Sequence, residues 1–224
     1  MITKDIKSYL AENYSVYLEP VSELSKSAKG KVLVKDERKL YNFDKITEDL
    51  FPRNKPESAD AIYATNKRIF LVEYKSGFKK KITKDNFDKK RMSCYDDEEK
   101  YCEEYAKLFF KNQEKEDEVL KKSLQLKAVE SYMTLMKEIV SNSEVGEPGT
   151  KKSLIYCVVI DDYVESMEDT LNVLAKKKSD TNAIEDVRKS LSRFRKNKDK
   201  EYYYDDIMVL SPYEFKGFMD QNMS

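Results

Sequence analysis

Residues 60–75, which read DAIYATNKRIFLVEYK, predict a β-hairpin. Two runs of β-branched and aromatic residues flank Asn66 and Lys67, and asparagine tolerates the positive φ that a two-residue hairpin turn requires. A loop centred on this pair sets Asp60 directly opposite Glu73 on the neighbouring strand. A turn of odd length would instead slip the register by one residue and move Asp60 to the other face of the hairpin.

Three charged side chains converge on one face of this hairpin. Side chains alternate along a strand, so Lys75 lies on the same face as Glu73, and Asp60 stands opposite Glu73. Two opposed carboxylates repel each other unless a cation lies between them. Mg²⁺ is a hard cation that one or two carboxylates, retained waters and phosphate oxygens can hold.

This arrangement suits the hydrolysis of a phosphodiester. A bound Mg²⁺ would polarise the phosphoryl oxygen and lower the pKa of a bound water, and Lys75 would orient that water or offset developing charge. Asp60, Glu73 and Lys75 are therefore the candidate catalytic residues, with Asp60 and Glu73 as the metal ligands. The alternative interpretation is a surface hairpin that ends in a Glu-Lys pair. Other acid-x-Lys triplets occur in this chain, in which 38% of the residues are charged, but they lie in polar or helix-like segments.

Asp60, Glu73 and Lys75 resemble the PD-(D/E)xK signature of restriction-endonuclease-like nucleases, both in the Asp-x12-Glu-x-Lys spacing and in the hairpin setting. Ala59 stands where that family usually has proline. The resemblance implies a restriction-endonuclease-like core, in which helices flank a central mixed sheet of about four to five strands. It also implies one or two Mg²⁺ ions, for which Mn²⁺ can substitute, and hydrolysis of DNA or, less often, RNA. Restriction or phage defence is the biological role that it suggests.

Members of this family also contribute polar residues from the helices around the site. Glu48, in the helix expected before the hairpin, is the candidate additional acid, and an exposed helix charge is the alternative interpretation. In the helix expected after the hairpin, Gln125 would lie near the site, or Lys121 one turn earlier on the same helix face.

The composition excludes several other chemistries. The chain has no histidine, which rules out Ser-His-Asp and Cys-His catalysis, histidine-zinc sites and nucleases with a histidine general base. Its three cysteines form no Cys-x-x-Cys motif, which favours a reducing cytoplasm over a disulfide framework. No apolar run approaches the roughly 18–20 residues that cross a bilayer. We therefore expect a cytoplasmic protein without a membrane partner.

Lysine plus arginine and aspartate plus glutamate both number 42, so no global positive charge favours a nucleic-acid partner. Two local basic groups could nevertheless contact phosphates, and a solvated helix end is the alternative interpretation of the second. They are Lys79, Lys80 and Lys81, directly after the motif strand, and Arg193 and Arg195 near the C-terminal end.

The remaining patterns predict an α/β fold of layered, α+β character in which helices separate the strands. The chain is long enough for a single nuclease-like domain over 1–224, with residues 79–115 as a charged helical insertion. The apolar run SLIYCVVI, residues 153–160, predicts a buried central strand, and shorter strands are expected over 31–35 and 206–210. Helices are expected over 3–14, 43–50, 85–112, 117–141, 181–196 and 212–219.

Two functional hypotheses of different classes remain. The first is a Mg²⁺-dependent nuclease, with DNA favoured over RNA and a homodimer as one way to cut both strands, although no self-complementary patch can be identified. The second is a catalytically inactive nuclease-like fold that binds nucleic acid or protein. A rival phosphatase or nucleotide hydrolase built on Asp161 and Asp162 lacks a glycine-rich phosphate loop. The intact triad favours the nuclease.

Overall fold

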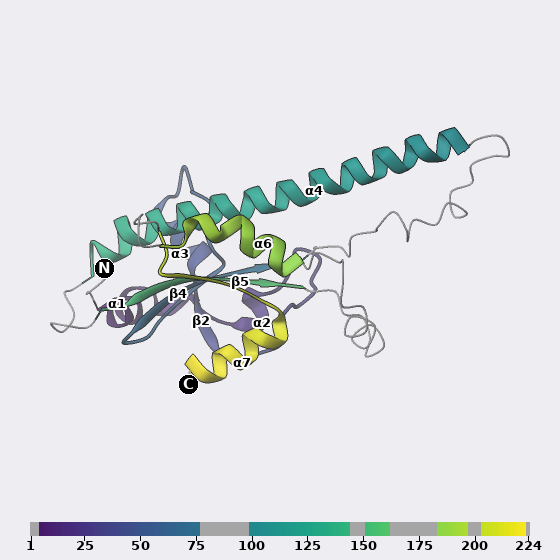
Figure 1. The fold of residues 1–224 in the computed structure, drawn as a ribbon. Helices are drawn as coiled ribbons and strands as arrows, with labels where there is room; N and C mark the ends of the chain where they lie inside the picture. Colours follow the sequence, from purple (N-terminus) through teal and green to yellow (C-terminus); the bar gives the residue numbers. More distant parts are fainter. Residues whose placement is uncertain (1–4, 77–98, 144–150, 162–182, 197–202, 223–224) are drawn as a thin grey trace.

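One open, mixed β-sheet with helices on both sides forms the centre of the protein (Figure 1). The computed structural model describes residues 5–76, 99–143, 151–161, 183–196 and 203–222. The strands follow the order of the sequence across the sheet, so each strand pairs with its neighbours in the chain. They are β1 (Leu18–Pro20), β2 (Lys39–Asn42), β3 (Ala61–Ala64), β4 (Arg68–Lys75), β5 (Ser153–Ile160) and β6 (Asp206–Leu210).

The sheet changes from antiparallel to parallel at β4. Strands β1 to β4 pair antiparallel, whereas β4, β5 and β6 run parallel. A parallel neighbour requires a crossover connection, and helix α4 lies on the connection between β4 and β5. Every residue of β5 after Ser153 is buried, as its continuous apolar sequence predicted for a central strand covered on both faces.

The number of strands exceeds the predicted four to five because β1 and β2 extend the antiparallel edge to a six-stranded sheet. The strand predicted over 31–35 is wrong: that segment contributes only an isolated bridge, between Val32 and Lys26. The strands predicted over 153–160 and 206–210 are confirmed as β5 and β6.

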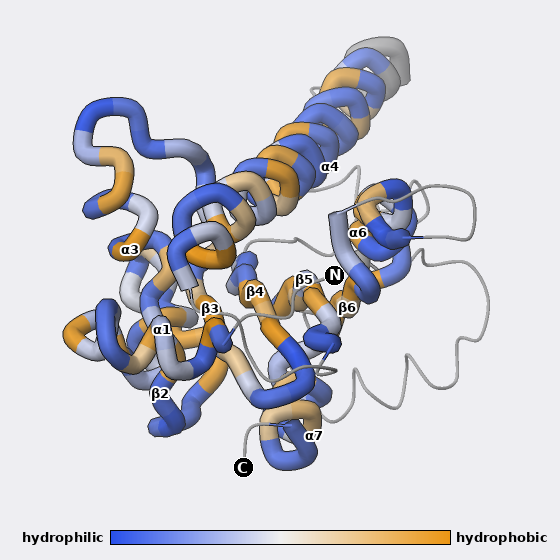
Figure 2. The backbone as a smooth tube through the Cα atoms, turned by 90° about the vertical axis from the view of Figure 1, so that its left-hand side faces the viewer, coloured by the Kyte–Doolittle hydropathy of each residue, from blue (hydrophilic) through white to orange (hydrophobic). Residues whose placement is uncertain are grey.

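Helices cover both faces of the sheet. One face packs under α1 (Ile6–Asn13), α3 (Phe43–Leu50), α4 (Glu99–Thr134) and α6 (Ala183–Leu191), and the other under α2 (Val21–Leu24) and α7 (Pro212–Asn222). Short helical turns η1 (Ser15–Tyr17) and η5 (Ser192–Phe194) and a π-helical segment η4 (Leu135–Val140), which continues α4, complete the described helices. Figure 2 shows hydrophobic residues along β3, β4 and β5, where the two helical layers meet the sheet.

Local sequence signals start two of the helices that flank the sheet. The side chain of Asn42 caps α3 by accepting a hydrogen bond from the Lys45 amide at 2.9 Å. Ser211 and Glu214 form a reciprocal capping box before α7, in which Pro212 occupies the first turn. These signals explain why the helices at 43–50 and at the C-terminus begin where the sequence predicted.

Helix α4 is longer than expected. The sequence predicted separate helices over 85–112 and 117–141, but one helix runs unbroken from Glu99 to Thr134. The charged KNQEKEDE segment contains no proline or glycine that would end it. Of the predicted insertion over 79–115, residues 79–98 lie outside the described residues. The rest forms the amino-terminal part of α4, which projects beyond the sheet (Figure 1). In the described part of the chain, no helix is both long and apolar enough to span a membrane.

Candidate functional site

The predicted register of the hairpin is confirmed. β3 and β4 pair with Ala64 opposite Ile69 and Ala61 opposite Val72. The Thr65 amide donates to the Arg68 carbonyl at 2.8 Å and so closes a two-residue turn. Continuing this register by one residue brings Asp60, at the entrance to β3, opposite Glu73 in β4.

The two carboxylates meet around a single ammonium group. Nζ of Lys127, from α4, lies 2.9 Å from both Oε1 and Oε2 of Glu73 and 3.4 Å from Oδ1 of Asp60. The other oxygen of Asp60, Oδ2, accepts a hydrogen bond from the Tyr74 amide at 2.6 Å. Both acids therefore present oxygens to the same point, which a positive charge occupies.

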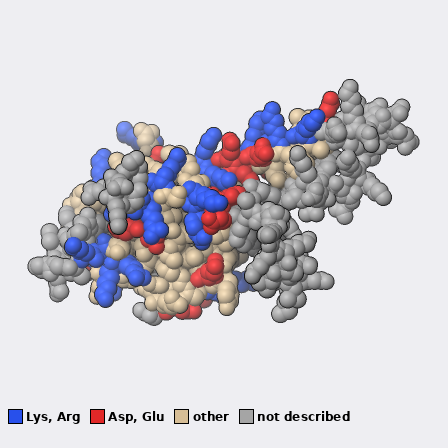
Figure 3. Space-filling model, viewed as in Figure 1, with Lys and Arg blue, Asp and Glu red and all other residues tan. Residues whose placement is uncertain are grey.

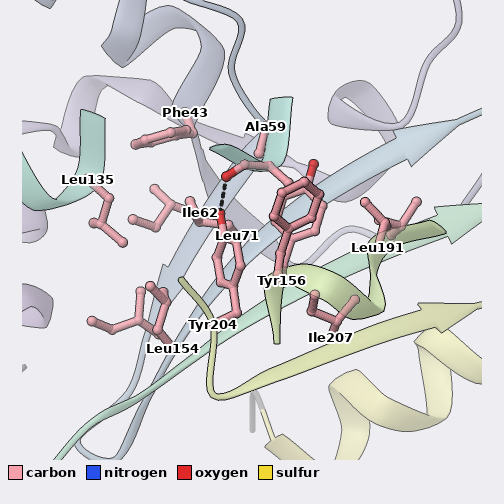
Figure 4. Packing of buried hydrophobic residues seen from close by; sticks show 14 of the residues in the cluster. Phe43, Ala59, Ile62, Leu71, Leu135, Leu154, Tyr156, Leu191, Tyr204 and Ile207 are labelled. Carbon is pink, nitrogen blue, oxygen red and sulfur yellow. Dashed lines mark hydrogen bonds between the residues drawn. The ribbon is translucent and has the colours of Figure 1, made fainter. Parts of the chain in front are cut away.

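Two long-range hydrogen bonds hold α4 against the sheet in the position that brings Lys127 to the two carboxylates. Tyr204 donates its hydroxyl proton to the carbonyl of Ala128, the residue after Lys127, at 2.6 Å (Figure 4). One turn later, Oγ of the buried Ser131 accepts a hydrogen bond from the Ala59 amide at 2.7 Å. Because Ala59 precedes Asp60, Ser131 and Lys127 tie one face of the helix to one end of the hairpin.

Burial shifts the pKa values of the charged groups in the site. The Glu73 side chain is only 1% exposed and that of Lys127 16%, whereas that of Asp60 is 25% exposed. Burial and the nearby charge of Asp60 raise the pKa of Glu73 well above its ordinary value, and Lys127 only partly opposes them. Burial also raises the pKa of Asp60. Burial alone would lower the pKa of Lys127, but the two carboxylates outweigh it and raise that pKa.

The site accordingly favours an additional positive charge. Two ionised carboxylates and one ammonium leave one negative charge without a partner among these three groups. In a buried setting such a charge is costly, and either a proton or a further cation relieves it. The raised pKa of Glu73 follows first from its burial and second from the charge of Asp60, which Lys127 and Lys75 offset only in part.

Lys75 follows Glu73 by two residues in β4 and so projects from the same face of the strand. Its side chain is partly exposed, and its charge favours the ionised form of Glu73, although less than that of Lys127 does. Lys127 thus supplies the ion pair to both acids, and Lys75 supplies a second positive charge nearby.

The acid nearest to the site from α3 is Asp44 and not Glu48. The Glu48 side chain is exposed, whereas Asp44, one turn earlier, accepts hydrogen bonds from Ser58 and Lys55, both at 2.6 Å. The charge of Asp44 acts on both Asp60 and Lys127. Burial opposes ionisation of Asp44, but Lys55 and Ser58 outweigh it, so the pKa of Asp44 is lowered and the group stays ionised.

Gln125 and Lys121 join α4 to α6. The Gln125 amide donates to the Ser190 carbonyl at 3.1 Å and accepts from Arg193 at 2.6 Å, and Lys121 lies 3.7 Å from Asp186. Gln125 and Lys127 are two residues apart and therefore project from different sides of the helix. The structure places these two candidates at the α4–α6 contact and not at the carboxylates.

Only one of the two predicted basic groups, Arg193 and Arg195, lies within the described residues. Lys79, Lys80 and Lys81 lie outside the described residues. The Arg193 guanidinium lies over the Phe194 ring, and Arg195 lies 3.2 Å from Asp206. On the face shown in Figure 3, acidic side chains lie among the basic ones. Contact of Arg193 or Arg195 with phosphates therefore stays a prediction.

Sequence reasoning missed Lys127, although a signal was present. Lys127 lies within the apolar stripe of α4, next to Ala128 and one turn before Ser131, both of which are fully buried. A lysine on the buried side of a helix needs an acidic partner, and the hairpin offered an acidic pair that needed a cation. A buried lysine that needs an acidic partner and an acidic pair that needs a cation together predict the contact of Lys127 with Asp60 and Glu73.

The donors suit Mg²⁺ better than metals that need more protein ligands. Among the described residues, no group of three or more histidine, cysteine or acidic side chains is arranged to hold a metal. Mg²⁺ binds through one or two carboxylates, which Asp60 and Glu73 can supply, and completes its shell with water and phosphate oxygens.

No family model, curated protein or solved structure matches the chain. The functional conclusion therefore depends on this geometry.

Proposed function

We propose that the protein is a Mg²⁺-dependent nuclease that hydrolyses phosphodiester bonds, with DNA as the favoured substrate. The observation that carries this proposal is the convergence of Asp60 and Glu73 on one cation position, to which Lys127 bonds at 2.9 and 3.4 Å. Asp60, at the entrance to β3, and Glu73, in β4, are brought together there in spite of their mutual repulsion. A binding site for a positive ion is the simplest explanation for two mutually repelling carboxylates held so close together.

Each residue of the site has a task in this chemistry. Asp60 and Glu73 would hold the ion, which polarises the phosphoryl oxygen and lowers the pKa of a bound water. The Tyr74 amide fixes the orientation of Asp60, and Ser131 holds the backbone just before it. Lys127 and Lys75 place positive charge beside the carboxylates, where it would attract the phosphate and offset the charge of the transition state.

The architecture supports the same proposal. A mixed sheet flanked by helices is what the resemblance to restriction-endonuclease-like nucleases implies, and the Asp-x12-Glu-x-Lys residues lie on its central hairpin. The strand that carries Glu73 also lies between an antiparallel and a parallel neighbour. A role in restriction or phage defence is part of this proposal and rests on the resemblance.

One observation favours a second candidate function. Lys127 already supplies a positive charge to both carboxylates, so it could replace the metal in a fold that has lost its activity. Such a protein would bind nucleic acid or another protein without cleaving it. The two candidates differ in whether a divalent ion enters the site.

A cleavage assay tests the proposal. Purified protein is incubated with single- and double-stranded DNA and RNA in Mg²⁺, in Mn²⁺ and in EDTA, beside Asp60→Asn and Glu73→Gln. Glu12→Gln, which makes the same kind of change on the exposed face of α1, is the matched control. Circular dichroism establishes that each variant is folded.

We expect cleavage only with a divalent ion, and a loss on the order of 100-fold or more in the two site variants. The control should cleave like the wild type. Cleavage that survives in Glu73→Gln would show that the activity belongs to another site or to a contaminant. If folded wild-type protein cleaves none of the four substrates, the inactive binding fold becomes the better account.

A further inference from the structure

Helix α4 carries a second, exposed stripe on the side opposite its buried face. Leu124, Ala128 and Leu135 face the sheet and are fully buried. Leu126 and Met133 lie about half a turn away and are 48% and 55% exposed. Apolar side chains on the solvent side of a charged helix have no role in the core of this domain.

The exposed stripe has the spacing of a coiled-coil seam. Its positions follow one another in alternate steps of four and three, with a further step of seven at the end. Its apolar members are 48% to 67% exposed, and none of them belongs to the sheet-facing layer. We call this set the outer stripe: Leu108, Asn112, Lys115, Val119, Lys122, Leu126 and Met133.

We propose that the outer stripe is the interface of a homodimer, in which α4 of one copy packs antiparallel against α4 of a second copy. The inference is independent of the proposed nuclease activity. The amino-terminal half of α4 projects beyond the sheet (Figure 1), so the described strands and helices leave this half of the outer stripe exposed. A 36-residue helix is long enough for several heptads of contact.

The lysines of the outer stripe favour one direction for the partner helix. In a parallel dimer Lys115 would face Lys115 of the second copy, and Lys122 would face Lys122, at two seam positions. In an antiparallel dimer centred between Leu120 and Lys121, Lys122 comes level with Val119 of the second helix, where Glu118 flanks the seam. Like charges thus separate, and the stems of Lys122 and Lys115 cover Val119 and Leu126 of the second helix.

The same alignment matches the apolar members. Leu108 of one copy comes level with Met133 of the other, so each end of the interface carries a large apolar pair. Asn112 comes level with Val129 of the second helix, which is half-buried against the core of its own domain and lies outside the outer stripe. The separation of the lysines and the pairing of Leu108 with Met133 therefore favour the antiparallel direction over the parallel one.

The oligomeric state of the full chain tests this interface. Sedimentation equilibrium is measured under reducing conditions for the wild type, for Leu108→Glu/Met133→Glu, which places glutamates opposite each other at both ends of the interface, and for Val16→Glu. The last variant makes the same change at a valine that is 81% exposed in η1, away from α4. We expect a dimer for the wild type and Val16→Glu, and a dimer dissociation constant raised on the order of 100-fold or more for the double variant. A monomeric wild type, or a dimer that persists in the double variant, would overturn the proposal.

Cross-linking tests the direction. A short bifunctional thiol reagent is applied to a mixture of Leu108→Cys and Met133→Cys proteins, with wild type as the background for the native cysteines. We expect mixed dimers to cross-link above that background and each single variant alone to stay at it. Cross-linking of Leu108→Cys with itself would show a parallel dimer and overturn the antiparallel assignment.

Discussion

The Lys127 ammonium lies 2.9 Å from both carboxylate oxygens of Glu73, although 54 residues separate the two in the sequence. The contact joins the long helix α4 to the central strand β4 and includes Asp60, which directly precedes the neighbouring strand β3. This contact bears on both the stability of the fold and the proposed chemistry, because the ammonium that bonds to both acids lies at the position proposed for a metal.

Replacing Lys127 by methionine keeps the length of the side chain but removes the charge. We expect Lys127→Met to lower the free energy of unfolding by about 3 kcal/mol in EDTA, because the acids then stay buried without their partner. Mn²⁺ should restore part of this loss by entering the site. Urea denaturation measures both effects. Lys137→Met, at a side chain that is 75% exposed, should change stability by less than about 0.5 kcal/mol. Equal losses in the two variants would contradict the buried ion pair.

The raised pKa of Glu73 predicts a particular dependence on pH. The folded state binds the Glu73 proton more tightly than the unfolded chain does, so this group stabilises the fold at low pH. That contribution is lost as the pH rises from about 4.3, the ordinary glutamate pKa, through the raised value. Asp60, Lys127 and Lys75 are the charged groups that act on Glu73, and they are the same in wild type and variant.

The test compares Glu73→Gln, which cannot ionise, with the wild type in EDTA. We expect the variant to gain stability relative to wild type as the pH rises, by up to about 1.4 kcal/mol per pH unit. Urea denaturation from about pH 4.5 to about pH 8 gives the difference, and Glu12→Gln makes the same change at an exposed site. A difference that is constant over this range, or that falls with pH, would show that the pKa of Glu73 is not raised in the folded protein.

Ser131 positions the backbone beside the site. In Ser131→Ala the buried amide of Ala59 loses its acceptor, which we expect to cost about 2 kcal/mol of unfolding free energy. Because Ala59 precedes Asp60, nuclease activity should fall as well, even under conditions in which the variant is fully folded. Ser192→Ala, at an exposed serine in η5, is the matched control. Unchanged activity in folded Ser131→Ala would exclude a positioning role.

Asp44 and Glu48 can be separated as the additional acid of the site. Asp44 acts electrostatically on both Asp60 and Lys127, whereas Glu48 is exposed one turn later. We expect Asp44→Asn to weaken metal-dependent cleavage about 10-fold, the size of effect that groups behind a metal's direct ligands have. The rates of Asp44→Asn and Glu48→Gln, measured at several Mg²⁺ concentrations, decide between them. A loss confined to Glu48→Gln would reverse the assignment in favour of the sequence-based candidate.

The hairpin was predictable because its register depends on local rules. A two-residue turn at Asn66 and Lys67 determines every pair up to Ala61 and Val72, and through them the approach of Asp60 to Glu73. The buried strand β5 was equally visible, because its apolar run has no other reasonable place than the centre of a sheet.

The edge of the sheet and the role of Lys127 were not predictable in this way. Strand β1 contains three residues, one of them a proline, and forms only because β2 is available to pair with it. The position of Lys127 depends on how deeply α4 packs, which the contacts of Tyr204 with Ala128 and of Ser131 with Ala59 determine. Those pairs are 76 and 72 residues apart, beyond the reach of local patterns.

Binding of Mn²⁺ to the Asp60–Glu73 pair is the measurement that tests the proposed metal site most directly. Electron paramagnetic resonance of Mn²⁺ is titrated with wild type, Glu73→Gln and Lys127→Met. We predict a Mn²⁺ site in the wild type that is lost in Glu73→Gln and tighter in Lys127→Met, because the ammonium no longer competes with the ion for the carboxylates. Equal binding by the wild type and by folded Glu73→Gln, or no binding by the wild type at millimolar Mn²⁺, would contradict a metal site at these residues.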